Sequence, residues 1–256
     1  MATITTMLTM GIIMVDEQSR FQPQALLRLQ SWLSPAFPTG AYSYSHGLEW
    51  AVEAGDVYDR TSLVDWLEAD LSYGSGRNEA IFFVEAYRCA TDYRCASDDD
   101  HRAKFFEVAE LAAAFRGTAE FALESSQQAG ACLSTLRQVW PDGVLDWLSE
   151  TLGERHAQPA LAIVLGAASA TQRIPAELAL PAFLQSWLAN LVTAGVRLIP
   201  LGQTDGQLAI AELEQAVRAA SMRAGKSTID DLGSAAFMVE LASMAHETQY
   251  TRLFRS

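Results

Sequence analysis

Three short segments of this sequence carry side chains whose types and spacing could do chemistry. His46, Glu49 and Glu53 follow one another at intervals of three and four residues, so on a helix they would share one face. An imidazole beside carboxylates could act as an acid-base pair, or it could hold a divalent metal weakly. With no thiolate or further His beside them the affinity for a metal would be poor, and a hydrogen-bonded face is the commoner meaning of such a pattern. We therefore predict no metal site.

The other two segments approach known reaction motifs, but each lacks an essential residue. Residues 225–227 read Gly-Lys-Ser, yet the first glycine of a phosphate-binding G-x-x-x-x-G-K-S loop would have to replace Ala220, and a helix precedes the segment where a strand is required. His246 and Glu247 begin like H-E-x-x-H, but Tyr250 stands where the second zinc-binding His belongs. Neither a nucleotide site nor a metalloprotease is predicted.

The segment from Ser34 to Trp50 is expected to join a proline-constrained loop to a helix. Pro35 and Pro38 fix φ and disfavour the α region for the residues before them, so the chain should enter the helix in one geometry. At about 100° per residue, that helix would have one polar and one apolar face. The polar face, expected to be exposed, comprises Tyr42, His46, Glu49 and Glu53, and the buried face comprises Tyr44, Leu48 and Ala51. A rigid loop that presents these groups suggests recognition of a partner.

Composition favours a protein that binds other proteins. Half of the 256 residues are hydrophobic and 19% are charged, below the roughly 25% usual for soluble domains, so a partner or a second copy is expected to cover apolar surface. The net charge of −13 argues against nucleic acid and anionic membranes as partners. Cys89, Cys95 and Cys132 show no CxxC spacing, so neither a disulfide framework nor a structural zinc site is indicated. A reducing cytoplasm fits best.

Helical periodicity dominates the chain, and alternating β-branched runs are nearly absent. We predict an all-α fold, with about ten helices of a single domain (residues 21–256) behind a disordered leader (residues 1–20). A long apolar helix from about Pro181 to Arg197 should be central, with Pro181 breaking any helix that arrives from Ala179. Thr204 and Gln207 form a possible capping box for the following helix.

Three separated stretches carry a family resemblance. The first is the segment 34–50, the second comprises residues 184–191 and 197–207, and the third is the ending 246–256. Together, and in this order, they resemble the urease accessory protein F family (UreF), from about Leu26 to the end of the sequence. Residues 90–155 are recognisable only as helical.

The resemblance implies a function and a set of partners. It implies a cytoplasmic, non-enzymatic accessory protein that is required for urease maturation through nickel incorporation. Such a protein would form a homodimer, bridge the accessory protein UreD/UreH and the GTPase UreG, and dock with them on apo-urease. Nickel and GTP would belong to that assembly, with no cofactor held tightly by this chain. A role in regulating GTP hydrolysis follows by analogy.

Particular residues are expected to act in this role or in its alternative. Partner contacts are expected at Tyr42, His46, Glu49, Glu53, Gln203, Thr204, Asp205, His246, Glu247, Tyr250, Arg252, Leu253, Phe254 and Arg255. The arginines would supply cationic contacts and Leu253 and Phe254 buried anchors. Four residues are expected to set the backbone geometry of loops instead of contacting partners. They are Pro35, Pro38, Gly40 and Gly202. The alternative is a small helical enzyme that uses His46 and Glu49 as an acid-base pair.

Overall fold

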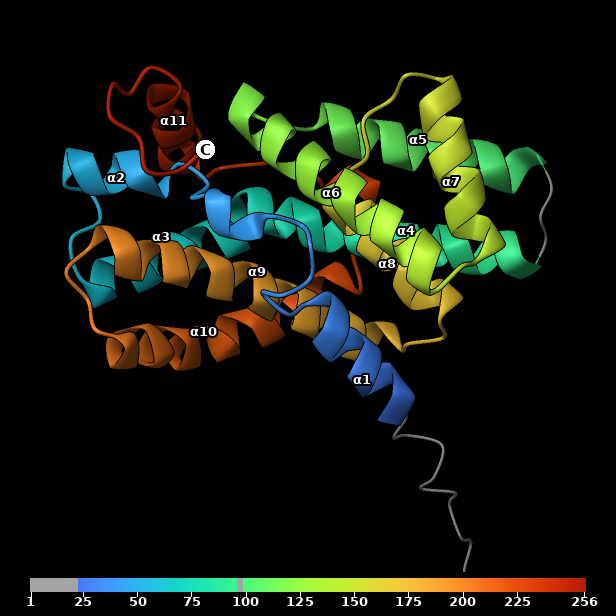
Figure 1. Ribbon diagram of the computed structural model, residues 1–256, viewed down its shortest axis with the longest axis horizontal. Coiled ribbons are helices and arrows are strands. Elements are labelled where there is room, and N and C mark those ends of the chain that lie inside the picture. The colour runs from blue at the N-terminus through green and yellow to red at the C-terminus, as the bar shows by residue number, and fades with distance from the viewer. Residues whose placement is uncertain (1–22, 96–98) are drawn as a thin grey trace, which may run out of the picture.

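The computed structural model describes residues 23–95 and 99–256, which form an all-α bundle without strands (Figure 1). Eleven α-helices and two short 3₁₀ helices follow one another along this part of the chain. They are α1 Pro23–Trp32, η2 Ala41–Ser43, α2 Leu48–Ala54, α3 Arg60–Tyr73, α4 Ser75–Cys95, α5 Asp99–Ala114, α6 Ala119–Val139, α7 Gly143–Glu154, α8 Leu161–Thr171, α9 Ala176–Leu198, α10 Gln203–Ala224, η3 Ile229–Asp231 and α11 Phe237–His246. The prediction of an all-α bundle is confirmed, and the leader expected for residues 1–20 lies outside the described residues.

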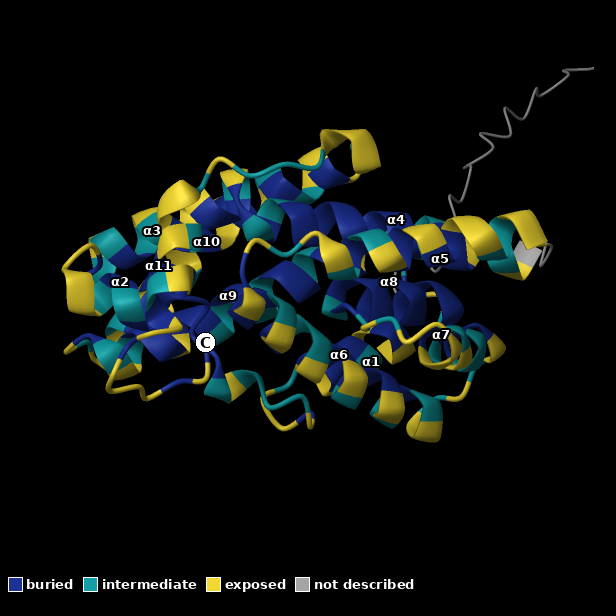
Figure 2. Cartoon of the chain, turned by 90° about the horizontal axis from the view of Figure 1, so that it is seen from above, coloured by how far each residue is buried: buried dark blue, intermediate teal, exposed yellow. Residues whose placement is uncertain are grey.

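The core is built around the contact between α4 and α8. Every residue of α8 from Ala162 to Thr171 is buried, and Figure 2 shows this helix in the interior with exposed residues on the outer helices. Small side chains let the two helices approach closely. A Cβ atom added at Gly166 would lie 2.4 Å from the backbone oxygen of Phe83 on α4. This apolar contact fixes the frame that the other helices cover.

The long apolar helix α9 lies against five other α-helices, α2, α3, α4, α8 and α10. The expected break at Pro181 is wrong, because α9 starts at Ala176 and continues through the proline. Among the described residues α9 is the one helix long and apolar enough to cross a membrane, but half of its most apolar stretch is buried within the protein. It is therefore a core helix, although α8 is the more completely enclosed of the two.

The start of α10 differs from the one predicted from the sequence. The capping box expected at Thr204 is wrong by two residues. Helix α10 begins at Gln203, and the Asp205 carboxylate accepts a hydrogen bond from the Gly202 N–H at 3.2 Å.

Cys89 and Cys132 are buried and unbridged, and burial raises the pKa values of their thiols to about 11 and about 12. Both therefore behave as small hydrophobic residues.

The helix expected to carry Tyr42, His46, Glu49 and Glu53 on one face starts later than predicted, so Tyr42 and His46 lie outside it. A single 3₁₀ turn ends at Ser43, Tyr44 is extended, and His46 and Gly47 both have left-handed backbones, with φ values of 57° and 77°. Helix α2 starts only at Leu48. The helical path is thus interrupted at His46 and Gly47, and the residues before and after this point do not share one helical face.

Candidate functional site

The last residues of the sequence lie back across the segment that precedes α2. The Arg255 N–H donates to the Ser43 carbonyl at 2.8 Å, and the Ser45 N–H donates to the Ser256 carbonyl at 2.6 Å. Figure 1 shows the C-terminal end beside this segment. Two of the three stretches singled out in the sequence therefore meet in space, although about 200 residues separate them.

His246 joins these two stretches to α6 through a buried cluster of charged groups. It is the last residue of α11 and is fully buried. Its Nδ1 atom lies 2.8 Å from Glu120 Oε2 on α6, and its Nε2 atom lies 3.1 Å from Glu49 Oε2 on α2. An imidazole held between two carboxylates gives both of them a hydrogen-bond partner in a buried place, where polar groups left alone would be costly.

The two carboxylates of this cluster also hold the tail. Glu49 accepts the backbone N–H groups of Leu253 at 2.6 Å and Phe254 at 2.9 Å. Glu120 accepts a hydrogen bond from Arg252 Nη1 at 3.1 Å. Burial raises the pKa of Glu120, against the lowering effect of its hydrogen bond to His246. We call this set of interactions, made by Glu49, Glu120, His246 and residues 252–254, the tail seam.

A second buried histidine lies next to the tail seam. His46 Nδ1 is 3.1 Å from Glu124 Oε2, and His46 Nε2 is 2.7 Å from Ser75 Oγ, which in turn donates to Asp70 at 2.9 Å. Phe121 stacks on the imidazole with ring centroids 3.8 Å apart. We call His46, Asp70, Ser75 and Glu124 the His46 cluster. Ser256 Oγ also reaches it, donating to Glu124 at 3.1 Å.

The charges around His46 decide its protonation. Burial alone would lower its pKa, but the negative charges of Glu124, Asp70 and Glu79, together with the hydrogen bond to Glu124, raise the pKa above the ordinary 6.5. Burial raises the pKa of Asp70, although the His46 charge and the bonds from Ser75 oppose this. A protonated His46 can donate to Glu124 and Ser75 at once, which satisfies both neighbours.

The expectation that His46 and Glu49 lie on an exposed polar face is wrong. Their exposed fractions are 8% and 7%, because the left-handed turn at His46 and Gly47 directs them toward α6 and the tail. His246 and Phe254 are buried within the chain as well. Tyr44, Leu48 and Ala51 are buried as expected.

Exposed residues of the same two stretches form a shared surface around the tail seam. Arg197 of α9 lies over the ring of buried Phe254, 4.4 Å from its centroid, and its Nη1 donates to the Tyr42 carbonyl at 3.0 Å. The tail, α9 and the segment before α2 are thereby held together. We use the name joint surface for seven exposed side chains on the tail, on α2 and on the segment before α2. They are Tyr42, Glu53, Glu247, Tyr250, Arg252, Leu253 and Arg255.

Residues 203–205 were expected to form part of a binding loop, but they are the first turn of α10. Asp205 pairs with Arg60 of α3 at 3.6 Å. In the described part of the chain no hydrogen bond or ion pair connects Gln203, Thr204 or Asp205 to the tail seam. Gly202 has an ordinary φ of −80°, whereas Gly40, with a φ of 73°, does adopt a left-handed backbone before η2.

Sequence reasoning missed the residues that complete both buried clusters. Glu120 and Glu124 lie on α6, and Asp70 and Ser75 lie at the junction of α3 and α4. The sequence did contain a signal for Glu120 and Glu124. Glu120, Glu124 and Gln128 are spaced by four residues, and they share a helix face that is buried and that includes Phe121 and Cys132. Polar groups on an otherwise apolar face indicate buried hydrogen-bond partners.

The arrangement does not favour metal binding or the proposed acid-base pair. No group of three or more His, Cys, Asp or Glu side chains within residues 23–95 and 99–256 is placed to hold a metal ion. Glu49 is engaged by His246 and by two tail amides, whereas His46 is engaged by Ser75 and Glu124. The two groups therefore serve different clusters, and the geometry suits positioning of the tail.

Comparison with known proteins gives consistent matches. The UreF family model matches residues 57–214. The urease accessory protein UreF of Rhodopseudomonas palustris strain HaA2 is 48% identical over 235 residues, which cover 92% of this chain and 95% of that protein. The protein of the same name from Bradyrhizobium diazoefficiens strain USDA 110 is 45% identical over 232 residues, covering 91% and 92% of the two chains.

Proposed function

Because the chain belongs to the UreF family of urease accessory proteins, we propose that it is a cytoplasmic, non-enzymatic scaffold that supports nickel insertion into urease. In this role it binds UreD/UreH and the GTPase UreG and docks with them on apo-urease. Nickel and GTP are carried by the assembly, and this chain influences GTP hydrolysis by orienting the GTPase. The observation that carries the proposal is the tail seam, which brings residues 42–53 and 247–255 into one surface.

The joint surface is suited to protein recognition. Tyr42 is 72% exposed and Tyr250 is completely exposed, and charged side chains of both signs surround them. Aromatic and arginine side chains commonly provide most of the binding energy of an interface. The buried His46, Glu49, His246 and Phe254 then support binding indirectly, because they hold the surface in shape.

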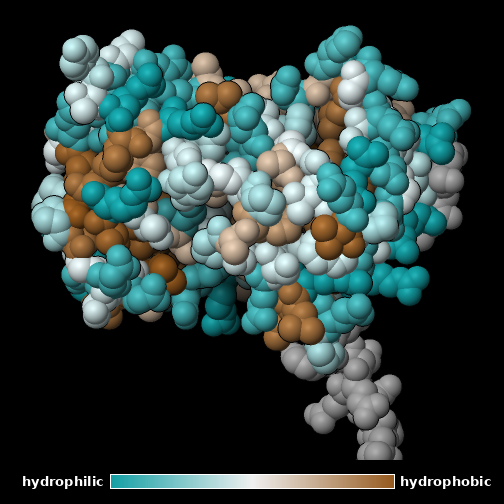
Figure 3. Space-filling model, viewed as in Figure 1, coloured by the Kyte–Doolittle hydropathy of each residue, from teal (hydrophilic) through white to brown (hydrophobic). Residues whose placement is uncertain are grey.

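Further exposed apolar side chains support binding to additional proteins or to a second copy of this chain. Figure 3 shows apolar side chains gathered at the end of the visible face where α2, α3, α9 and α10 lie in Figure 1. On α11, the exposed large apolar residues are Phe237, Met238, Leu241 and Met244. Surface of this kind favours contact with a partner, and we propose that the chain acts as a homodimer within the complex.

The test combines complex formation with urease activation. Size-exclusion chromatography with light scattering, on this protein mixed with UreD/UreH and UreG, should show a stable complex, and nickel-dependent urease activation should be lost when this protein is omitted. Tyr250→Ala should weaken the complex at least tenfold, since it removes an exposed aromatic contact. Tyr58→Ala, at a tyrosine that is 67% exposed outside the joint surface, is the matched control.

Two results would contradict the proposal. Normal urease activation without this protein would remove the assembly role altogether. Equal binding by the Tyr250 and Tyr58 variants would show that the joint surface is not where partners bind, even if the assembly role stands.

A further inference from the structure

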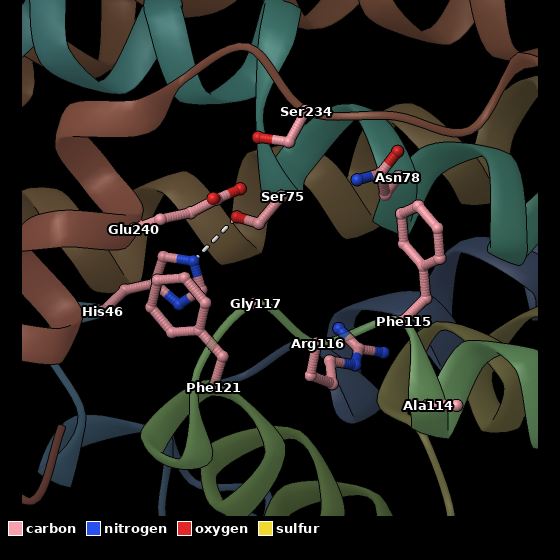
Figure 4. A pocket seen from close by; sticks show the side chains of 10 residues that line it. All are labelled: His46, Ser75, Asn78, Ala114, Phe115, Arg116, Gly117, Phe121, Ser234 and Glu240. Atoms are coloured by element: carbon pink, nitrogen blue, oxygen red, sulfur yellow. Dashed lines mark hydrogen bonds between the residues drawn. The ribbon is translucent and has the colours of Figure 1, made fainter.

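A cavity of about 300 Å³ lies beside the His46 cluster, between α4, the connection from α5 to α6, and the segment that enters α11. Its volume falls in the range of small-molecule sites. Figure 4 shows Phe115 and Phe121 on opposite sides of the space, Arg116 on one wall, and Ser234 and Glu240 facing it. Neither the tail seam nor the joint surface uses these last three side chains.

Arg116 leaves one hydrogen-bond donor unused within this cavity. Its Nη1 atom pairs with Glu79, and its Nε atom donates to the Ala112 carbonyl at 3.0 Å. Its Nη2 atom is buried and has no hydrogen-bond partner in the described part of the chain, and the side chain as a whole is 10% exposed. A buried donor left without an acceptor is costly, so an acceptor from outside the chain would be favoured here.

Two further groups define what that molecule must offer. Ser234 Oγ is also buried without a partner among the described residues. Glu240 extends its carboxylate toward the cavity, so it supplies an acceptor opposite the Arg116 donor. These three side chains present one donor, one hydroxyl group and one acceptor, with aromatic rings on either side. His46, Ser75 and Asn78 also line the cavity.

The charges select against ions. Glu79 already neutralises Arg116, and Glu124 and Asp70 balance the charge of His46. Glu240 adds a further negative charge, so a carboxylate ligand would be repelled. A cation could pair with Glu240 but would leave Arg116 Nη2 without an acceptor. A neutral group with one carbonyl oxygen and adjacent N–H donors satisfies all three polar groups at once.

We propose that this cavity binds a small primary carboxamide with an apolar substituent. The carbonyl oxygen accepts from Arg116 Nη2, and the amide N–H groups donate to Glu240 and to Ser234 Oγ. The substituent lies between Phe115 and Phe121, and Phe121 is fixed by its stacking on His46. The site rests on the cavity alone, so it stands or falls separately from the assembly role.

Benzamide is a suitable probe, and benzoate is its matched charged control. Dissociation constants measured by ligand-observed NMR titration of the full chain should be at least tenfold lower for benzamide than for benzoate. Glu240→Met removes the acceptor while keeping the length of the side chain, and it should weaken benzamide binding about tenfold. Glu214→Met, at an exposed position on α10, should leave it unchanged. Ser234→Ala should weaken it by a smaller factor.

The proposal is overturned if benzamide does not bind, or if benzoate binds as tightly. It is also overturned if the Glu240 and Glu214 variants bind benzamide equally, because the cavity would then hold solvent or accept any aromatic molecule. The comparison of benzamide with benzoate uses the unmodified protein, so the test does not depend on the folding of a variant.

Discussion

The contact between α4 and α8 and the tail seam are both buried, but they are held together by different forces. In the first, every residue of α8 from Ala162 to Thr171 is buried, and the two backbones approach closely at Gly166. In the second, charged side chains from α2, α6 and α11 meet around His246 and bind the tail through its backbone amides.

This difference separates stability from presentation of the joint surface. Apolar packing contributes in proportion to the area it buries and does not depend on protonation. A buried charged cluster contributes little net stability when complete, yet it is strongly destabilised when one member is removed. Changes at the α4–α8 contact should therefore lower the stability of the whole bundle, whereas changes at the tail seam should act mainly on the tail.

The largest effect is expected for Gly166→Val. The new Cβ atom would lie 2.4 Å from the Phe83 carbonyl oxygen and 3.1 Å from Ala86 Cβ, so α4 and α8 must move apart. We expect a loss of about 3 kcal/mol in the free energy of unfolding, measured by urea denaturation. A loss below about 0.5 kcal/mol, the level of an ordinary surface substitution, would contradict the importance of this contact.

A smaller effect is expected for Gly47→Ala, next to the tail seam. Gly47 has a φ of 77°, and an added Cβ atom would lie 2.8 Å from the Ser243 nitrogen of α11. The backbone strain and the steric clash together should lower the free energy of local unfolding at the tail seam by about 2 kcal/mol. Limited proteolysis with trypsin should show cleavage at Arg252 and Arg255 before cleavage at Arg88 on α4, the partner of α8 in the core. Simultaneous cleavage in both regions would show that the two regions are not separable.

The smallest effect is a pH dependence at the His46 cluster. Because the folded pKa of His46 is raised above 6.5, its stabilisation is fully present below pH 6.5 and is lost as the pH rises through the folded pKa. The difference in free energy of unfolding between the unmodified protein and His46→Gln should therefore be larger at pH 6 than at about pH 9.

His156→Asn is the control for this pH dependence, because His156 is exposed and asparagine tolerates its left-handed backbone. It should change the free energy of unfolding little at either pH. The result that would contradict this prediction is a loss of stability in His46→Gln, relative to the unmodified protein, that grows with pH. It would show that the surrounding carboxylates do not favour the charged imidazole.

The sequence predicted the features of the fold that depend on local signals. Helical periodicity without alternating β-branched runs indicated the all-α fold, and the long apolar helix ends close to the predicted Arg197, since α9 ends at Leu198. Pro181 misled because its neighbours keep α9 helical across the missing N–H. The prediction that the helix includes Tyr42 was also wrong. His46 has a left-handed backbone, and its side chain is held by Glu124 and Ser75, which are distant in sequence.

The sequence identified the right segments of the candidate site but not how they fit together. Residues 42–53 and 246–255 were treated as separate partner-binding groups, and no local pattern indicates that His246 contacts Glu49. Spacing by four could place Glu120 and Glu124 on one face of α6, but it could not show which histidine faces each of them. Such pairings depend on how helices far apart in the chain are packed.

Hydrogen exchange in His246→Ala tests the separation of core and tail most directly. Without the imidazole, Glu49 and Glu120 lose the buried partner that they share and only Arg252 still pairs with Glu120, so the tail should detach while the bundle stays folded. We predict that the amides of Leu253 and Phe254 exchange at least tenfold faster than in the unmodified protein, whereas those of Val164 and Leu165 in α8 do not change. Unchanged exchange in the tail, or equal acceleration in α8, would contradict the account.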